Sequence, residues 1–434
     1  MNDKAELTLR GLFFFSLPSI LGSLLEPISG VVDSALIGHV DTKWLAALSL
    51  GVILLSSFTW VFNFLIHTST QAVSEAYSRG DFEELLRKIK VALFLSVIVG
   101  LASSVLLYLF RYPLFNLIGV TPDLEKFVEQ YYNVRLIGQT FLIVSFTCIS
   151  ILRGLSKVSL SFYIIFATTF LNILISWILL KFTSLGISSV AWGTVIASFI
   201  AMILSLALLF RGEISLDKLR KVSLGSDHWI HFGKNSFDMF CRSLILTTCF
   251  FVSTKLASRL GVESLAAHQI LLELWLISSF LIDGVAVSAN ILSAKFKGQL
   301  NIESYKLMRN NVLLMGGLIG GLFTLSYFLF PEFLWSIFSS DQRVYEEIGT
   351  VWIYVALAQV VVAISYVYDG ILFGLGKFRY LRTQMFFGLI ISYVPFAFLS
   401  VTHNSLLMIW LGLISLGVYR LFIGFFGTRV PWES

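Results

Sequence analysis

Long hydrophobic stretches alternate with short polar connections along almost the whole chain. An α-helix of about 20 apolar residues crosses the hydrocarbon core of a bilayer, and each of these stretches reaches that length. Apolar runs this long predict helices rather than strands. We therefore expect an all-α membrane protein with twelve transmembrane helices, over residues 11–38, 44–77, 83–110, 124–152, 158–181, 186–210, 229–257, 263–294, 302–330, 345–374, 380–402 and 405–426.

The composition agrees with a membrane protein and argues against a soluble protein, a nucleic-acid-binding protein and a zinc or disulfide protein. Of the 434 residues, 57% are hydrophobic and 13% are charged, and the mean hydropathy is +0.84. A soluble protein of this size carries more polar surface. The net charge of +5 lies in short connections rather than on one face, so it does not indicate nucleic-acid binding. Cys148, Cys241 and Cys249 lie in apolar stretches and predict neither disulfides nor a zinc site.

The basic residues of the connections predict the orientation of the chain. If the N-terminus is cytoplasmic, the inside connections hold 21 Lys and Arg and the outside connections hold seven. Cytoplasmic loops of membrane proteins carry such an excess, so we expect both termini in the cytoplasm and the chain in the plasma (inner) membrane. The first stretch exceeds signal-peptide length and lacks a small-residue cleavage site, which predicts that its helix is retained.

A polar segment near mid-chain, RGEISLDKLRKVSLGSDH at 211–228, predicts a cytoplasmic linker between an N-lobe, 1–210, and a C-lobe, 229–434. The two halves resemble each other at a constant offset of 220 residues. LAA at 45–47 matches LAA at 265–267, GLSK at 154–157 matches GLGK at 374–377, and Gln139 matches Gln359. Six spans per repeat give both halves the same orientation, with a pseudo-twofold axis along the membrane normal. This organisation predicts two pseudo-symmetric six-helix lobes with a cavity between them, which suits alternating access.

The first stretch contains polar residues that a helix in lipid would avoid. Glu26 and Asp33 are seven residues apart and share one helix face, with Ser29 and Gly30 between them. Pro27 cannot donate a backbone hydrogen bond, which predicts a helix hinge. An intramembrane acid indicates function by default, and burial disfavours its charged form, so Asp33 could exchange protons near neutral pH. The alternative for Asp33 is a fixed hydrogen bond between helices, and a neighbouring base or hydroxyl could simply satisfy Glu26.

The other polar residues inside the predicted spans divide between sites and packing. Asp238 and Arg242, spaced i, i+4, predict a structural pair, and Asp369 predicts an interface or packing residue. Arg135 could offset an acid across the bundle. The candidates for a substrate cavity are Trp60, Phe62, Asn63, His67, Glu273 and Asp283. A lone helical histidine such as His67 is more often a satisfied interior residue than a proton carrier.

Motifs of soluble enzymes are absent from the sequence. It contains no GxxxxGK[ST] loop, no HExxH and no CxxC. We therefore expect neither an enzyme nor a bound cofactor or metal, and ATP is not the expected energy source. Ion coupling through Asp33 is the expected one.

Several longer stretches are typical of one transporter family. These are PISGVVDSALIGHVDTKWLAALSLG at 27–51, FNFLIHTSTQAVSEAYSRGD at 62–81, LGVESLAAHQI at 260–270, DGVAVSANILSAKFKGQ at 283–299 and YDGILFGLGKFR at 368–379. In these stretches and in its 6+6 repeat the chain resembles the multidrug and toxic compound extrusion (MATE) transporters, and most of all their DinF-like branch. The resemblance covers nearly the whole chain.

The resemblance implies a V-shaped pair of lobes that exports organic cations, drugs or amphipathic metabolites in exchange for H⁺ or Na⁺. It implies an ion-coupling set of Asp33, Asn172, Thr194 and Tyr131, and Glu26 is a further candidate for this set. Many relatives have an aspartate where this chain has Ser176, so the acid pair that would bind a metal cation is incomplete. This departure favours protons, since a hard cation needs several oxygen ligands, while nearby Glu26 leaves Na⁺ open. Protonation of Asp33 from outside would let the first helix bend near Pro27 and shrink the substrate cavity.

Three other functions fit the sequence less well than ion-coupled export. A lipid-linked oligosaccharide or lipid flippase of related 6+6 fold would need a strongly basic cavity, and within the spans only Arg135, Arg242 and Arg420 offer positive charge. A membrane-embedded enzyme would need a catalytic cluster such as a His/Asp pair in one span, which is absent. A passive channel fits the duplication less well than gated transport. The expected partners are a small-molecule substrate, H⁺ or possibly Na⁺, and the lipid bilayer, with the chain a monomer.

Overall fold

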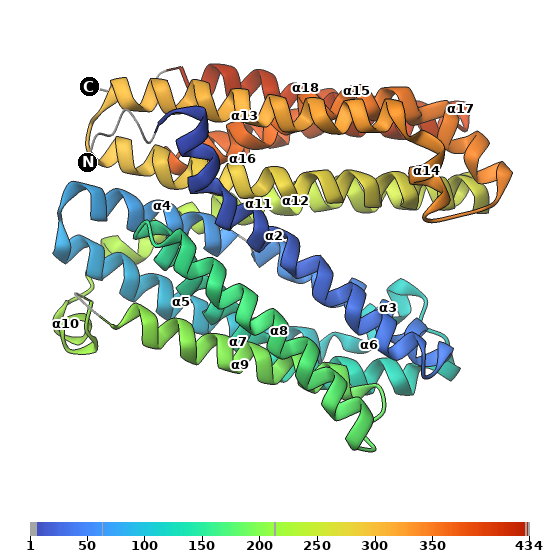
Figure 1. Cartoon of the computed structure of the whole chain (residues 1–434), viewed down its shortest axis with the longest axis horizontal. Helices are drawn as coiled ribbons and strands as arrows, with labels where there is room; N and C mark the ends of the chain where they lie inside the picture. The colour runs from blue at the N-terminus through green and yellow to red at the C-terminus, as the bar shows by residue number, and fades with distance from the viewer. Residues whose placement is uncertain (1–6, 63, 212–213, 430–431, 433–434) are drawn as a thin grey trace. The chain divides into compact units, whose positions relative to one another are not determined.

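The computed structural model describes residues 7–62, 64–211, 214–429 and 432, without the side chains of Glu26, Ser57, Thr59, Trp60 and Val61. Every regular element in this part of the chain is a helix, as predicted (Figure 1). The helices are α2 (Leu9–Gly38), α3 (Thr42–Phe62), α4 (Phe64–Arg79), α5 (Phe82–Leu109), α6 (Arg111–Ile118), α7 (Pro122–Gly154), α8 (Val158–Phe182), α9 (Ser188–Leu209), α10 (Leu216–Lys221), α11 (Ser226–Leu260), α12 (Val262–Gly298), α13 (Ile302–Leu329), α14 (Pro331–Ser336), α15 (Gln342–Gly374), α16 (Phe378–Gly388), the π-helix η1 (Leu389–Tyr393), α17 (Val394–His403) and α18 (Leu406–Gly427).

The number of membrane-crossing helices agrees with the pattern of hydrophobic stretches. Eleven helical segments of the described chain are long and apolar enough to cross a bilayer, and α3 adds a shorter apolar segment, Thr42–Ser56. The predicted second span, 44–77, is covered by α3 and α4 on either side of Asn63. The predicted eleventh span, 380–402, is formed by α16, η1 and α17 in succession.

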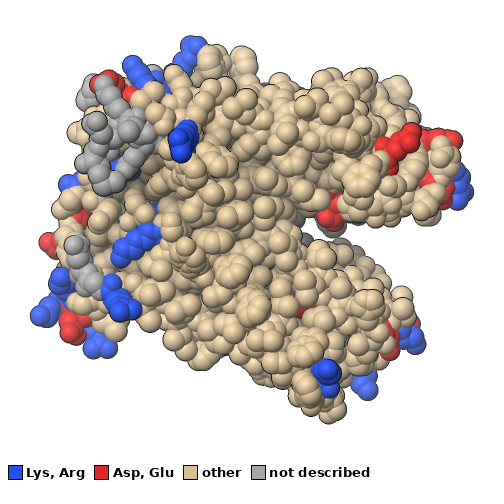
Figure 2. All heavy atoms as spheres, in the orientation of Figure 1, with Lys and Arg blue, Asp and Glu red and all other residues tan. Residues whose placement is uncertain are grey.

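The surface has the character that a bilayer requires. Large apolar side chains are exposed along the helices, for example Leu322 at 63% and Phe398 at 67%. Figure 2 shows Lys, Arg, Asp and Glu gathered near the ends of the helices, with almost uninterrupted apolar and uncharged surface between them. Apolar surface on this scale would drive a soluble chain to aggregate, so it indicates contact with lipid.

The chain divides into two compact units. One comprises Leu21–Lys234, and the other joins the residues up to Ile20 with those from Asn235 onward. Helix α2 therefore contributes to both units. Its first turns pack on α12, where a Cβ added at Gly284 would lie 2.4 Å from Ile20 Cα. The predicted linker, 211–228, includes α10, and Lys90 on α5 donates to the carbonyl of Val222 at 2.7 Å.

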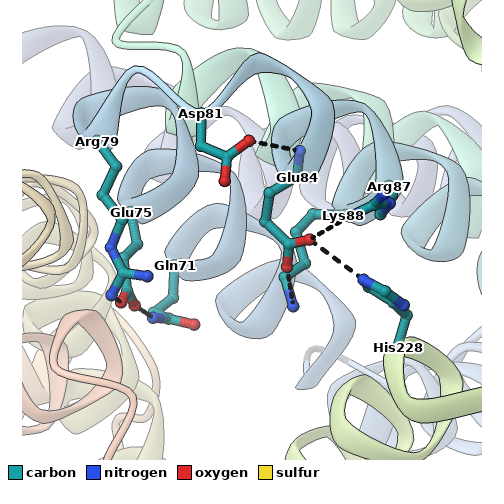
Figure 3. A network of polar contacts seen from close by, with 8 residues as sticks. All are labelled: Gln71, Glu75, Arg79, Asp81, Glu84, Arg87, Lys88 and His228. Carbon is teal, nitrogen blue, oxygen red and sulfur yellow. Dashed lines mark hydrogen bonds and ion pairs between the residues drawn. The ribbon is translucent and has the colours of Figure 1, made fainter. Parts of the chain in front are cut away.

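Charged side chains tie the start of α11 to α5 within the Leu21–Lys234 unit (Figure 3). Glu84 accepts from Lys88 at 2.9 Å and lies 3.2 Å from His228 Nε2. Asp81 caps the N-terminus of α5 by accepting the backbone N–H of Glu84 at 3.0 Å. Such contacts fix the start of α11 against α5, near the end of the Leu21–Lys234 unit. They are partly exposed, so each adds little stability by itself.

Candidate functional site

Asn172 on α8 joins three helices of the Leu21–Lys234 unit. The side chain is 5% exposed. Its Oδ1 accepts from the hydroxyl of Ser29 on α2 at 3.0 Å, and its Nδ2 donates to Thr194 Oγ1 on α9 at 3.0 Å. An amide can bond in two directions at once because one end accepts and the other donates. Helix α2 is thereby attached to both α8 and α9.

These hydrogen bonds have a fixed direction. Thr194 donates its own hydroxyl proton to the carbonyl of Val190 at 3.0 Å. A carbonyl can only accept, so the proton order runs from Ser29 through Asn172 and Thr194 to Val190. The Ser29 oxygen then keeps its lone pairs for a further donor. We call this series the Ser29–Asn172–Thr194 chain.

Asp33 lies one helical turn beyond Ser29 on the same face of α2. It is partly buried, and its Oδ1 is buried without a hydrogen-bond partner among the described residues. Its neighbours are Ser176 on α8 and the guanidinium of Arg135 on α7. Ser176 Oγ is buried, and its hydroxyl acts as a hydrogen-bond donor to the Asp33 carboxylate. Buried polar atoms are rarely left unpaired, so the open Oδ1 of Asp33 indicates a place where a proton or another donor can bind.

Two residues of α7 complete the surroundings of Asp33. Tyr131 is 3% exposed, and its ring lies over Gly51 of α3, where an added Cβ would come within 2.6 Å of it. The Arg135 guanidinium lies 5.9 Å from the Tyr131 ring centroid. Gly51 therefore makes room for the tyrosine, and the tyrosine lies beside the arginine. The suggestion that Arg135 faces an acid across the bundle is consistent with its position near Asp33.

A narrow gap beside this cluster is too small to hold a water molecule. It is lined by Arg135, Gly138, Gln139, Leu142, Thr194, Val195 and Ser198. Because it has no room for water, the gap is a packing defect and not a ligand site. It reaches both Thr194 of the hydrogen-bonded chain and Arg135.

Close packing of α8 on α9 sets the position of Ser176. A Cβ added at Gly193 would lie 2.1 Å from Ser176 Oγ. Ser176 is one turn beyond Asn172 on α8, so the same face of this helix presents both residues. In the sequence, Ser176 stands out only as a departure from the family pattern and Ser29 only as a small residue. The i, i+4 spacings of Ser29 with Asp33 and of Asn172 with Ser176 are the signal that could have grouped them.

The remaining predicted residues lie elsewhere or outside the description. Pro27 lies within α2, which is assigned as one helix through it. Phe62 ends α3 with its ring 6.3 Å from that of Phe64, and His67 lies on α4. Glu273 and Asp283 lie on α12, in the other unit, the first exposed and the second partly buried. Asn63 and the side chains of Glu26 and Trp60 lie outside the described residues.

The predicted pairing of Asp238 with Arg242 is wrong. Asp238 accepts from Arg382 on α16 at 2.5 Å, and Arg242 binds Asp369 on α15. Residues spaced i, i+4 can interact, but an isolated pair on a helix surface contributes only about 0.2–0.5 kcal/mol. Buried cross-helix partners therefore decide the pairing. Asp369 on α15 binds arginines of two other helices, Arg242 on α11 and Arg420 on α18.

Comparison with known proteins agrees with this architecture. A family model described as MatE matches residues 18–178 and again 239–399. Protein DETOXIFICATION 44, chloroplastic, of Arabidopsis thaliana is 28% identical over 436 residues, covering 96% of this chain and 82% of that protein. DNA damage-inducible protein F of Escherichia coli is 23% identical over 386 residues, covering 87% and 83%. A crystal structure of a mutant Vibrio cholerae MATE transporter, VcmN, has a TM-score of 0.90 at 17% identity, covering 99% of this chain and 98% of that one.

Proposed function

Because the chain belongs to the MatE family of membrane transporters, we propose that it is a secondary active antiporter that exports organic cations, drugs or amphipathic metabolites in exchange for protons. As a member of this family the chain is an integral, multi-pass transporter and not an enzyme. Its similarity to DNA damage-inducible protein F is compatible with the DinF-like branch. The proposal extends to the driving ion, the coupling residue, the substrate class, the inner-membrane location and the cytoplasmic termini.

Asp33 is the proposed coupling residue. The observation that carries this proposal is the buried Oδ1 of Asp33, which has no hydrogen-bond partner among the described residues, one turn from the Ser29–Asn172–Thr194 chain. An ionised carboxylate only accepts hydrogen bonds, whereas a protonated one also donates. Protonation thus adds a donor to a group that otherwise only accepts, and it removes the negative charge on which Arg135 acts. The two forms favour different packing of α2 against α7 and α8.

Helix α2 could carry this change beyond the site. Its part up to Ile20 belongs to the unit that contains α12, and its part from Leu21 onward to the unit that contains Asp33. Pro27 removes one backbone hydrogen bond from α2 and makes it easier to bend. A proton can shift the balance between two states only by its different affinity for them, so coupling requires that Asp33 binds protons more tightly in one state.

The chemistry of the site favours protons over sodium ions. A sodium site needs several oxygen ligands and a countercharge. Here Asp33 stands beside a permanent cation, Arg135, and position 176 supplies a hydroxyl instead of a second carboxylate. The positive charge of Arg135 partly neutralises Asp33, as a bound metal cation would. A proton needs only one acceptor and fits this arrangement.

Transport in inverted vesicles tests the identity of the ion. These vesicles expose the cytoplasmic side, so export appears as uptake of a fluorescent organic cation. We expect accumulation with an acidic interior and none with a sodium gradient at equal pH. For one-to-one exchange, a gradient of about one pH unit corresponds to about tenfold accumulation. Accumulation driven by sodium alone would contradict proton coupling.

Substitution of Thr194 tests the hydrogen-bonded chain. Valine has nearly the shape of threonine but no hydroxyl, so Thr194→Val leaves the Asn172 amide without its acceptor. A hydrogen bond contributes about 1 kcal/mol, and we expect the initial rate of proton-driven uptake to fall about fivefold. Thr194→Ser keeps the hydroxyl and serves as the matched control, with a near wild-type rate expected. Equal activity of the Val and Ser variants would exclude a role for this hydroxyl.

A further inference from the structure

Three buried charged residues meet in the unit that contains Asn235–Ser434, apart from the residues used in the proposed function. They are Arg242 on α11, Asp369 on α15 and Arg420 on α18, with 8%, 2% and 4% of their surface exposed. Arg420 Nη2 donates to Asp369 Oδ2 at 2.6 Å, and Arg242 Nη2 donates to the same oxygen. Two guanidiniums thus share one carboxylate oxygen, and the three residues carry a formal charge of +1.

The backbone and two aromatic rings hold this triad in place. Gly370, next to Asp369, lies so close to α12 that an added Cβ would be 2.3 Å from the carbonyl oxygen of Ala286. The Arg420 guanidinium lies 4.6 Å from the Tyr366 ring centroid, and that of Arg242 lies 5.2 Å from the Phe373 centroid. Rings on the faces of the guanidiniums leave hydrogen bonding to the N–H edges.

The hydrogen-bonding capacity of the triad is only partly used. Arg242 Nε, Arg420 Nε and Asp369 Oδ1 are buried and have no hydrogen-bond partner within the described residues. Each guanidinium has five N–H donors, and Asp369 Oδ2 accepts from only one nitrogen of each. Asp369 acts electrostatically on both guanidiniums, and Arg420 acts on Arg242. Tyr366 also acts on both and forms a side-chain hydrogen bond with Arg420. Burying an excess charge is unfavourable, and an added negative charge would offset it.

A second buried pair in the same unit gives a direct comparison. Asp238, 1% exposed, accepts from Arg382 Nη1 at 2.5 Å. This pair is one-to-one and carries no excess charge. A unit that needed only helix cross-links would be served by such pairs. Cross-linking of helices therefore does not explain why Asp369 binds a second arginine.

We propose that the Arg242–Asp369–Arg420 triad binds an oxyanion, a carboxylate or phosphate group, through N–H groups that Asp369 does not use. Planar guanidinium forks match carboxylate and phosphate oxygens in two-point contacts. Asp369 holds the two arginines together and limits the excess positive charge of the triad to one. This charge matches an oxyanion with a single negative charge. The anion approaches the triad from the side of Arg242, because the Arg242 side chain is 10% exposed whereas that of Asp369 is 3% exposed. The group belongs to a small molecule or to the headgroup of an anionic lipid.

Thermal unfolding of the purified full-length chain in neutral detergent tests this site. At constant ionic strength, we expect acetate and inorganic phosphate to raise the Tm saturably relative to chloride. Arg242→Gln leaves Asp369 and Arg420 as a balanced pair, so it should keep the anion-free Tm and lose the anion-dependent rise. Asp369→Asn removes the competing carboxylate, so it should lower the anion-free Tm and bind the anion about tenfold more tightly.

Nanodiscs distinguish the two sources of the oxyanion. If a lipid headgroup fills the triad, phosphatidylglycerol in a phosphatidylcholine nanodisc raises the Tm of the wild type and leaves no further rise for phosphate. If a small molecule fills it, the phosphate effect persists in both membranes. In each case the effect should disappear in Arg242→Gln.

The matched control is Arg382→Gln, which leaves Asp238 buried without its partner. It should lower the Tm while keeping the full anion-dependent rise. Arg242→Lys keeps the charge without the fork and should weaken anion binding about tenfold, which covers the case that Arg242→Gln does not fold. The proposal is overturned if no oxyanion or lipid raises the wild-type Tm, or if the rise is as large in Arg242→Gln and Arg242→Lys as in the wild type. Neither result would bear on the role of Asp33, which lies in the other unit.

Discussion

We expect the Asp33→Asn variant to lose proton-driven accumulation of a fluorescent organic cation in inverted vesicles. Asparagine has the shape of the protonated acid but cannot release a proton, so the cycle stops in one form. The about tenfold accumulation expected for one pH unit should fall to the level seen without a gradient. The measurement is the steady-state fluorescence of vesicles that contain equal amounts of wild-type or variant chain.

Folding of this variant can be checked separately. Burying a neutral amide costs less than burying a carboxylate, so the Tm of Asp33→Asn should equal or exceed that of the wild type. The matched control is Glu125→Gln, an acid-to-amide change at an exposed position in the first turn of α7, with wild-type accumulation expected. Undiminished proton-driven accumulation by Asp33→Asn would remove Asp33 from the coupling mechanism.

The largest effect on stability is expected at Gly284, where α12 meets the start of α2. An alanine Cβ there would lie 2.4 Å from Ile20 Cα and 2.5 Å from Ile20 N, and neither backbone atom can rotate away. Overpacking of this kind costs about 1–3 kcal/mol, and small residues are what allow helices to approach closely in membranes. We expect Gly284→Ala to lower the free energy of unfolding by at least this amount, measured by titration with SDS in mixed micelles.

Gly321 on α13 supplies the control for this prediction. A Cβ added there meets nothing within 4 Å. Alanine is better than glycine in a helix by about 1 kcal/mol, so Gly321→Ala should leave the free energy of unfolding unchanged or raise it. Glycine-to-alanine substitution is thus expected to lower the free energy of unfolding at Gly284 and to maintain or raise it at Gly321. A stable Gly284→Ala variant would mean that α2 does not pack on α12 as described.

The candidate site was predictable in part. Asp33 stands out because a carboxylate is costly in an apolar stretch, and that signal needs only the local sequence. Asn172 and Thr194 came from the family resemblance, and the structure brings them together through one hydrogen bond. Ser29 as the donor to Asn172 could not be deduced, since a serine on an apolar helix has many possible partners. The predicted pairing of Asp238 with Arg242 was wrong because it relied on their i, i+4 spacing. The ion-pair partners of both residues lie on other helices.

The sequence by itself determined the helices, their order and the twofold repeat, because hydrophobic length and periodicity are local properties that every helix in lipid must satisfy. Only the tertiary structure decided which polar side chains meet. Asp369 binds two arginines that lie 127 and 51 residues away in the chain, and Ser29 reaches Asn172 across 143 residues. Such contacts depend on the packing of helix faces, where close approaches at Gly193 and Gly370 set the distances. A hydrogen bond or ion pair requires positions accurate to a fraction of an ångström, and hydrophobic patterning does not specify positions to that accuracy.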